Sequence, residues 1–108
     1  MIDFNSLNET VLHNFYGGEG DTVARMFVDN QNKIMKGKLA PGCSIGLHCH
    51  ETSSEIIFVL SGVGTVILDG IKETLTAGTC HYCQKGQSHT LINSGTEDLV
   101  FYAVVPQQ

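Results

Sequence analysis

The sequence is poor in basic residues and lacks long apolar runs. It has 6 lysine and arginine residues against 11 acidic ones and a net charge of −5, so no basic patch can neutralise several phosphates and nucleic acid is not an expected partner. No apolar run approaches the roughly 20 residues of a membrane-spanning helix. The N-terminal stretch MIDFNSLNETVLHNFY is too polar for a signal peptide. We therefore expect a cytoplasmic protein that binds neither nucleic acid nor membranes.

Proline is also scarce, and glycine and asparagine mark the turns instead. The chain has 2 prolines and 12 glycines, and turn signals such as DG at 69–70 and KG at 85–86 cut it into short segments. These segments are rich in β-branched and aromatic residues, and none sustains a helical period of apolar residues. The pattern predicts one all-β domain over residues 1–108, a sandwich or barrel of about nine or ten antiparallel strands.

Four cysteines permit a disulfide or a zinc site. Without an export signal the thiols should stay reduced. Cys80 and Cys83 form a CxxC, but the CHYC segment is predicted to be a strand, in which residues three apart point to opposite faces. Four separate thiols, Cys43, Cys49, Cys80 and Cys83, are therefore favoured over a zinc knuckle, which remains the alternative.

Strand alternation assigns side chains to faces. In KIMKGKLA, Lys36 and Lys38 share one face, which places Met35, Gly37 and Leu39 on the inner one. If the two histidines of IGLHCH face inward, the outward residues there are Ile45, Leu47 and Cys49. If Glu55, Ile57 and Val59 face inward, the outward residues of the next strand are Ile56, Phe58 and Leu60.

An outward apolar surface of this extent predicts a cover. We expect a homodimer through the outward faces of the 45–49 and 56–60 strands. The alternative cover is the N-terminal segment, residues 1–16, laid across the sheet or exchanged between subunits.

Histidines and a glutamate recur at the starts and ends of predicted strands. His48 and His50 are two apart, so both imidazoles leave the same face of a strand. Glu55 opens the next strand, and His89 follows the turn QKGQ. An HxH pair alone does not separate a metal site from chance. Three imidazoles and a carboxylate, if they meet, suit Fe, Mn, Ni, Co or Zn better than Ca or Mg.

Two stretches of the sequence resemble the two motifs of the cupin family. Residues 42–62 match the first motif at Gly42, His48, His50, Glu55 and Gly62. Residues 78–93 match the second at Gly78, Gly86, His89 and Asn93, with Gln84 where most cupins carry proline and Thr79 where many carry aspartate. The 15 residues between the motifs, 63–77, are at the short end of the family's range, and the resemblance extends over residues 39–105.

The resemblance implies a jelly-roll barrel, a double-stranded β-helix, that holds one divalent transition metal through His48, His50, Glu55 and His89. Candidate pocket-lining residues are Met35, Leu39 and His81, although His81 is more typical of a core or supporting histidine. Asn93 is expected to make structural hydrogen bonds. Arg25, the one arginine, could face an anionic ligand, but a surface position is favoured.

Such a site carries about one positive charge, so it favours a small anionic molecule. We expect a metalloenzyme of the dioxygenase, decarboxylase or isomerase type. The alternatives are a non-catalytic module that senses a metabolite or metal, and a structural barrel, against which the intact set of ligands weighs. The fold alone does not select a reaction.

Overall fold

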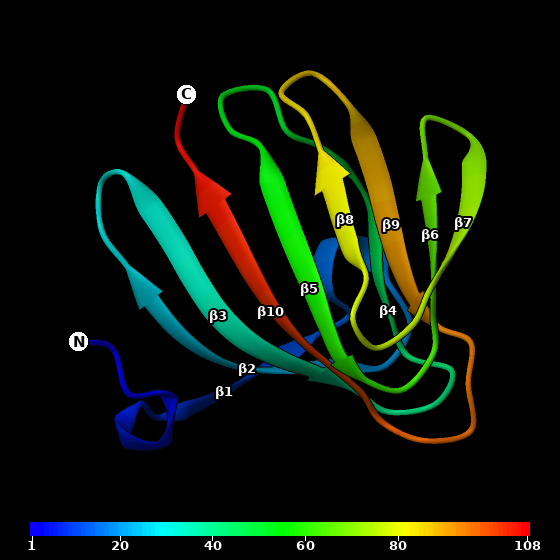
Figure 1. Ribbon diagram of the computed structural model, residues 1–108, viewed down its shortest axis with the longest axis horizontal. Helices are drawn as coiled ribbons and strands as arrows, with labels where there is room; N and C mark the ends of the chain where they lie inside the picture. The colour runs from blue at the N-terminus through cyan, green and yellow to red at the C-terminus, as the bar shows by residue number, and fades with distance from the viewer.

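Ten strands in two antiparallel sheets make up most of the chain (Figure 1). The computed structural model describes residues 1–108. The larger sheet has the order β1-β2-β3-β10-β5-β8, with β1 Glu9–His13, β2 Asp21–Val28, β3 Asn32–Leu39, β10 Leu99–Pro106, β5 Glu55–Ser61 and β8 Cys80–Cys83. The smaller has the order β4-β9-β6-β7, with β4 Ser44–Cys49, β9 Ser88–Asn93, β6 Gly64–Leu68 and β7 Ile71–Leu75. The prediction of about ten antiparallel strands is confirmed.

The two sheets face each other and enclose the core (Figure 1). Side chains alternate between buried and half-buried along β9 and β10, as expected for strands with one face toward a core. The largest fully buried apolar side chains are Leu39, Ile57, Val66, Leu91, Leu99 and Phe101. Two three-residue 3-10 turns, η1 Phe4–Ser6 and η2 Phe15–Gly17, are the helical elements. No helix here has the length and apolar character needed to cross a bilayer.

The predicted turns form where glycine allows them. Between β6 and β7, Asp69 and Gly70 have φ of 47° and 83°, the pair of left-handed residues that a two-residue hairpin turn requires. Gly86, in the turn ahead of His89, has a φ of 91°. Both positions were predicted from the sequence.

Strand alternation holds along β3 and β5. Met35 and Leu39 are buried and Lys38 is exposed. Glu55, Ile57 and Val59 are buried, whereas Phe58 and Leu60 are 47% and 41% exposed. In β8, Cys80 is exposed and Cys83 is buried, and all four cysteines are free, as the strand assignment predicts.

Alternation fails in β4, where Ile45 was expected to face outward. Ile45 is buried in the core, whereas Leu47 is 67% exposed as predicted. The cause is an irregularity in the pairing of β4 with β9: Ile45 pairs with Leu91 and His48 with His89, so two residues of β4 lie opposite one of β9. Such a bulge shifts the alternation by one residue, and Ile45 and His48 therefore both point inward.

The single outward patch expected over 45–49 and 56–60 does not form. β4 and β5 belong to different sheets, so Leu47 and Phe58 do not share a face. The N-terminal segment lies along the larger sheet: β1 extends it at the edge next to β2, and Phe4 of η1 packs against Tyr102 of β10, with ring centroids 5.2 Å apart. The guanidinium of Arg25 donates to the Leu7 carbonyl at 2.6 Å. Arg25 thus lies on the outside and fixes this segment.

Candidate metal centre

The structure brings together the four residues that the sequence singled out. His48 and His89 are direct partners across β4 and β9, so their side chains leave neighbouring positions of one sheet. Residues 50–54 then cross to the larger sheet, with His50 at the start of this connection and Glu55 at the first position of β5. His50, Glu55 and His89 are 8%, 7% and 1% exposed. The four ligand atoms lie within 4.8 Å of one another.

The donor atoms converge on one point. The Nε2 atom of His50 lies 3.1 Å from that of His48 and 3.0 Å from that of His89, and the His48 and His89 Nε2 atoms are 3.2 Å apart. Oε1 of Glu55 lies 2.9 Å from His89 Nε2, 3.1 Å from His50 Nε2 and 3.8 Å from His48 Nε2.

These separations fit the coordination of a metal ion. At a metal–ligand distance of about 2.1 Å, adjacent ligands of an octahedral ion are about 3.0 Å apart, and opposite ones about 4.2 Å. The three histidine nitrogens are adjacent to one another by this measure. Glu55 Oε1 is adjacent to His50 and His89 and nearly opposite His48. The four residues match an octahedron with two neighbouring positions left over.

The Nδ1 atom of each histidine ring, which points away from the centre, has its own hydrogen-bond partner. This partner orients the ring. His48 Nδ1 lies 2.8 Å from the Gly46 carbonyl oxygen, and His50 Nδ1 lies 2.9 Å from Ser53 Oγ. A carbonyl only accepts, so His48 Nδ1 carries the hydrogen, and in the neutral ring Nε2 presents a lone pair to the centre. Such partners are the usual support of histidines that bind a metal.

His81 contacts the His89 ring on the side away from the centre. Its Nε2 lies 3.0 Å from His89 Nδ1, and the residue is 3% exposed. Burial lowers the pKa of His81, which favours its neutral form. A neutral His81 can accept the hydrogen of His89 Nδ1, which leaves His89 Nε2 free to face the centre.

Glu55 is held as a carboxylate. Burial of Glu55 acts to raise its pKa, but hydrogen bonds donated by Nε2–H groups of His48, His50 and His89 in the metal-free protein outweigh burial and bring the pKa well below its usual value. A metal ion would take the place of those hydrogens. The centre therefore contains one fixed negative charge among three imidazoles, a mixed donor set that suits first-row transition metals.

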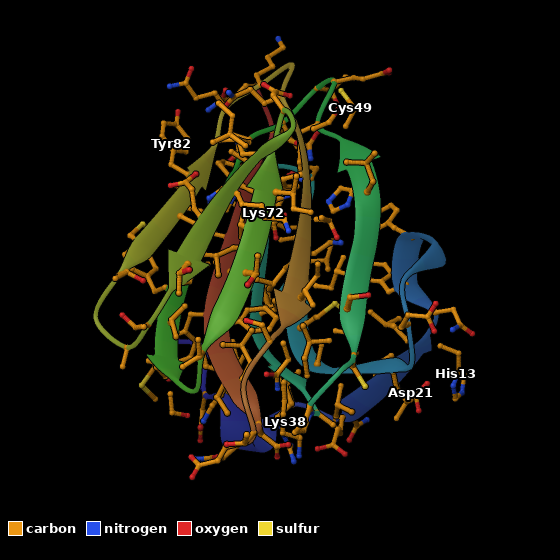
Figure 2. All side chains as sticks on the ribbon, turned by 90° about the vertical axis from the view of Figure 1, so that its right-hand side faces the viewer. His13, Asp21, Lys38, Cys49, Lys72 and Tyr82 are labelled. Atoms are coloured by element: carbon orange, nitrogen blue, oxygen red, sulfur yellow. The ribbon has the colours of Figure 1, made fainter.

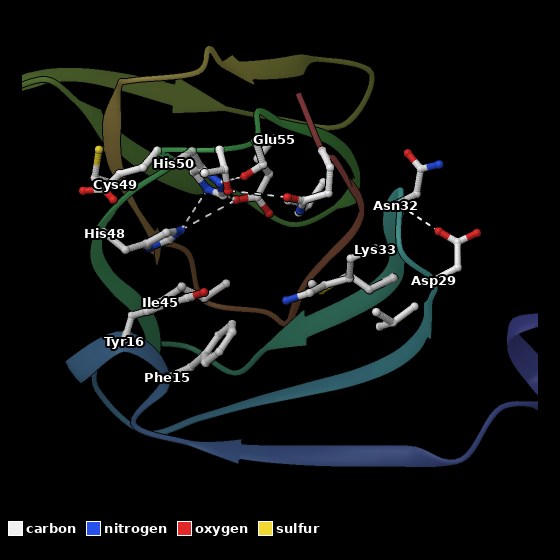
Figure 3. A pocket seen from close by; sticks show the side chains of 17 residues that line it. Phe15, Tyr16, Asp29, Asn32, Lys33, Ile45, His48, Cys49, His50 and Glu55 are labelled. Carbon is white, nitrogen blue, oxygen red and sulfur yellow. Dashed lines mark hydrogen bonds and ion pairs between the residues drawn. The ribbon is translucent and has the colours of Figure 1, made fainter.

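A cavity of about 390 Å³ opens onto this cluster, and Figure 3 shows its lining. His48, His50 and Glu55 form one side, and Met35, Ile45 and Val105 contribute apolar side chains. A size of a few hundred Å³, with a few polar groups in an apolar wall, is typical of sites for small molecules.

Two aromatic residues that the sequence analysis did not select complete the wall. Tyr16 stacks on the His48 ring, with centroids 4.0 Å apart and planes 13° apart, and Phe15 packs against Tyr16 at 4.4 Å. The close approach of η2 to β4 depends on glycine: a Cβ on Gly46 would lie 2.1 Å from the Tyr16 carbonyl oxygen, and one on Gly18 would lie 2.1 Å from that of Ser44. The GGEGD stretch at residues 17–21 indicates a turn, but no local sequence pattern indicates the contact between η2 and β4.

The three candidate pocket residues occupy different places. Met35 lines the cavity. Leu39 lies near the other end of β3 in the core, and His81 lies behind His89, so neither is part of the lining. Asn93 makes structural hydrogen bonds, as expected, since its Nδ2 donates to the carbonyls of Leu39 and Glu97, each at 2.8 Å.

Comparisons with known proteins agree with this architecture. A protein of Thermotoga maritima named oxalate-binding protein is 33% identical over 100 residues, which span 87% of this chain and 83% of that protein. The crystal structure of a predicted oxalate decarboxylase from the same organism has a TM-score of 0.93 at 29% identity and covers 100% of this chain and 99% of that one. A polyketide cyclase from Streptomyces resistomycificus has a TM-score of 0.81 at 19% identity, covers 100% of this chain and 79% of its own, and is similar in fold alone.

The sequence model of the family described as "Cupin domain" matches residues 35–105. The matched stretch contains all four residues of the cluster. By its sequence and its two-sheet fold, this chain belongs to the cupin family.

Proposed function

We propose that this chain binds one divalent transition metal through His48, His50, Glu55 and His89, and uses it to hold a small carboxylate such as oxalate. The observation that carries this proposal is the spacing of the four donor atoms, three nitrogens 3.0–3.2 Å apart and one carboxylate oxygen within 3.8 Å of each. The near-octahedral spacing favours Mn, Fe, Co or Ni over four-coordinate Zn.

The charge and shape of the site support an anionic chelating ligand. A divalent ion and the Glu55 carboxylate leave about one net positive charge in a largely buried centre, where an anion is attracted more strongly than in water. The two remaining neighbouring positions suit a ligand with two oxygens close together. The name of the Thermotoga relative, oxalate-binding protein, is consistent with such a ligand.

Catalysis at the same site is a second candidate. A bound metal would act as a Lewis acid or, if it is iron, activate oxygen. In the chain itself, Glu51 lines the cavity without belonging to the cluster, so its carboxylate could carry a proton to or from a bound anion. A decarboxylase, a dioxygenase and an isomerase all remain within this proposal.

The test begins with the metal content of protein purified without added metal. We expect close to one transition-metal ion per chain, and its loss in His50→Ala and His89→Ala, since each change removes a ligand. The matched control is His13→Ala, because His13 is exposed and outside the cluster. Stoichiometric metal in the His50→Ala, His89→Ala double variant would contradict the proposal. Oxalate titration, then analysis for carbon dioxide and formate, separates binding from turnover.

We also propose that two copies associate through the outer face of the larger sheet. Phe58, Leu60 and Tyr82 are 47%, 41% and 49% exposed, and β5 and β8, which carry them, are hydrogen-bonded neighbours. Figure 2 shows Tyr82 pointing away from the barrel. An apolar surface on adjacent strands favours association with an identical surface about a twofold axis.

A further inference from the structure

Lys33 is the one lysine or arginine that lines the cavity. It lies on the same alternating face of β3 as the buried Met35, whereas Lys38 is exposed on the opposite face. The residue is half-buried. Figure 3 shows its side chain extending from β3 into the space between Phe15 and the histidine cluster.

The ammonium group of Lys33 has no anionic partner within the chain. The ion pairs of the protein involve His13, Arg25 and the cluster around Glu55, and none includes Lys33. Asp29, which also lines the cavity, forms no ion pair with Lys33 and accepts hydrogen bonds from the backbone N–H groups of Gln31 and Asn32 at 2.9 and 2.7 Å. The contact that Lys33 does make is with an aromatic face, since Nζ lies 5.8 Å from the centroid of the Phe15 ring.

A cation that lines the cavity without a counter-charge is placed to receive an anionic group of a ligand. From this geometry we propose that Lys33 selects the ligand, because its ammonium receives the second anionic group of a molecule whose first group is held at the metal centre. The inference rests on the proposed function and names its substrate class: small dianions, chiefly dicarboxylates, in preference to monoanions of the same size.

Oxalate and glycolate form a matched pair of probes. Both place two neighbouring oxygens on a metal, but only oxalate carries a second negative charge. The experiment compares their dissociation constants by calorimetry on Mn²⁺-loaded protein, for the wild type, Lys33→Met, Lys33→Arg and the control Lys38→Met. Metal content and the unfolding temperature are measured for each variant, and Lys33→Gln replaces Lys33→Met if the latter does not fold.

We expect Lys33→Met to weaken oxalate binding on the order of 10- to 100-fold, the range for loss of a charge-assisted hydrogen bond, and glycolate binding by less than about threefold. Lys33→Arg should retain most of the preference for oxalate, and Lys38→Met should behave as wild type. If Lys33→Met weakened oxalate and glycolate binding equally, or weakened neither, the inference about Lys33 would be wrong while the proposed function would stand. A metal-loaded wild type that binds no oxalate would instead overturn the proposed ligand and, with it, this inference.

Discussion

Each histidine of the cluster uses its two ring nitrogens differently. Nε2 faces the centre, and Nδ1 bonds to a group that differs from ring to ring: a carbonyl for His48, a hydroxyl for His50 and another imidazole for His89. The carbonyl fixes one tautomer, whereas a hydroxyl or an imidazole can donate or accept. His89 therefore depends on the state of His81 for its orientation as a ligand.

This dependence predicts the effect of replacing His81. In His81→Leu, the Nδ1 hydrogen of the buried His89 loses its acceptor, and we expect metal affinity to fall about 10- to 100-fold, as for other partners of metal-binding histidines. Competition with a chelating dye measures the affinity. His81→Gln, whose side-chain carbonyl can accept the hydrogen, should recover part of it. An unchanged affinity in His81→Leu would show that His89 is oriented by packing alone.

At the scale of elements, sequence alternation predicted faces wherever the strands are regular. It placed Met35 and Leu39 inward in β3 and separated Cys80 from Cys83 in β8. It failed at Ile45, because a bulge is a feature of the pairing between two strands and is not encoded by a repeat within one.

The same reasoning explains which site residues were missed. Lys33 could have been found, since it shares the parity of Met35. Phe15 and Tyr16 could not: they reach the cavity through a contact between η2 and β4, segments far apart in the sequence, and Tyr16 has a left-handed φ of 54° that no strand or helix pattern predicts.

The strand geometry of β8 predicts how the thiols react. Cys83 is buried, and burial, together with the nearby Glu55 carboxylate, raises its pKa to about 11, so few Cys83 side chains are thiolates at pH 8. We expect iodoacetamide to modify the exposed Cys49 of the native protein and to leave Cys83 until the protein is unfolded. Peptide mass mapping checks both sites. A Cys80–Cys83 disulfide in the native protein would contradict the strand assignment.

At the scale of the whole molecule, the exposed apolar side chains are distributed unevenly between the two sheets. Phe58, Leu60 and Tyr82 lie on adjacent strands of the larger sheet, part of which Phe4 covers at Tyr102. Leu47 and Ile71 lie on β4 and β7 of the smaller sheet, which are not neighbours. Burial of a leucine, isoleucine or phenylalanine contributes about 1.5–3 kcal/mol before the costs of association. Several such residues on one face can therefore sustain a dimer.

The proposed dimer is tested by substituting one exposed residue on each sheet in turn. Light scattering of the wild type at micromolar concentration should give twice the single-chain mass of 11.7 kDa. Phe58→Asp should give a folded monomer, in which Cys80, the direct partner of Phe58 across β5 and β8, reacts faster with iodoacetamide. Leu47→Asp, on the other sheet, should remain dimeric. A monomeric wild type would contradict the proposed dimer.

The position of the cavity wall along the chain has a consequence for how such a protein can diverge. The four cluster residues lie within the stretch matched by the family, residues 35–105, whereas Phe15, Tyr16 and Lys33 lie before it. Mutations that reshape this part of the wall can therefore accumulate in the first 33 residues without altering the four cluster residues. Relatives of this chain could thus acquire new ligands by exchanging a short leading segment, while the barrel and the four-residue cluster are inherited unchanged.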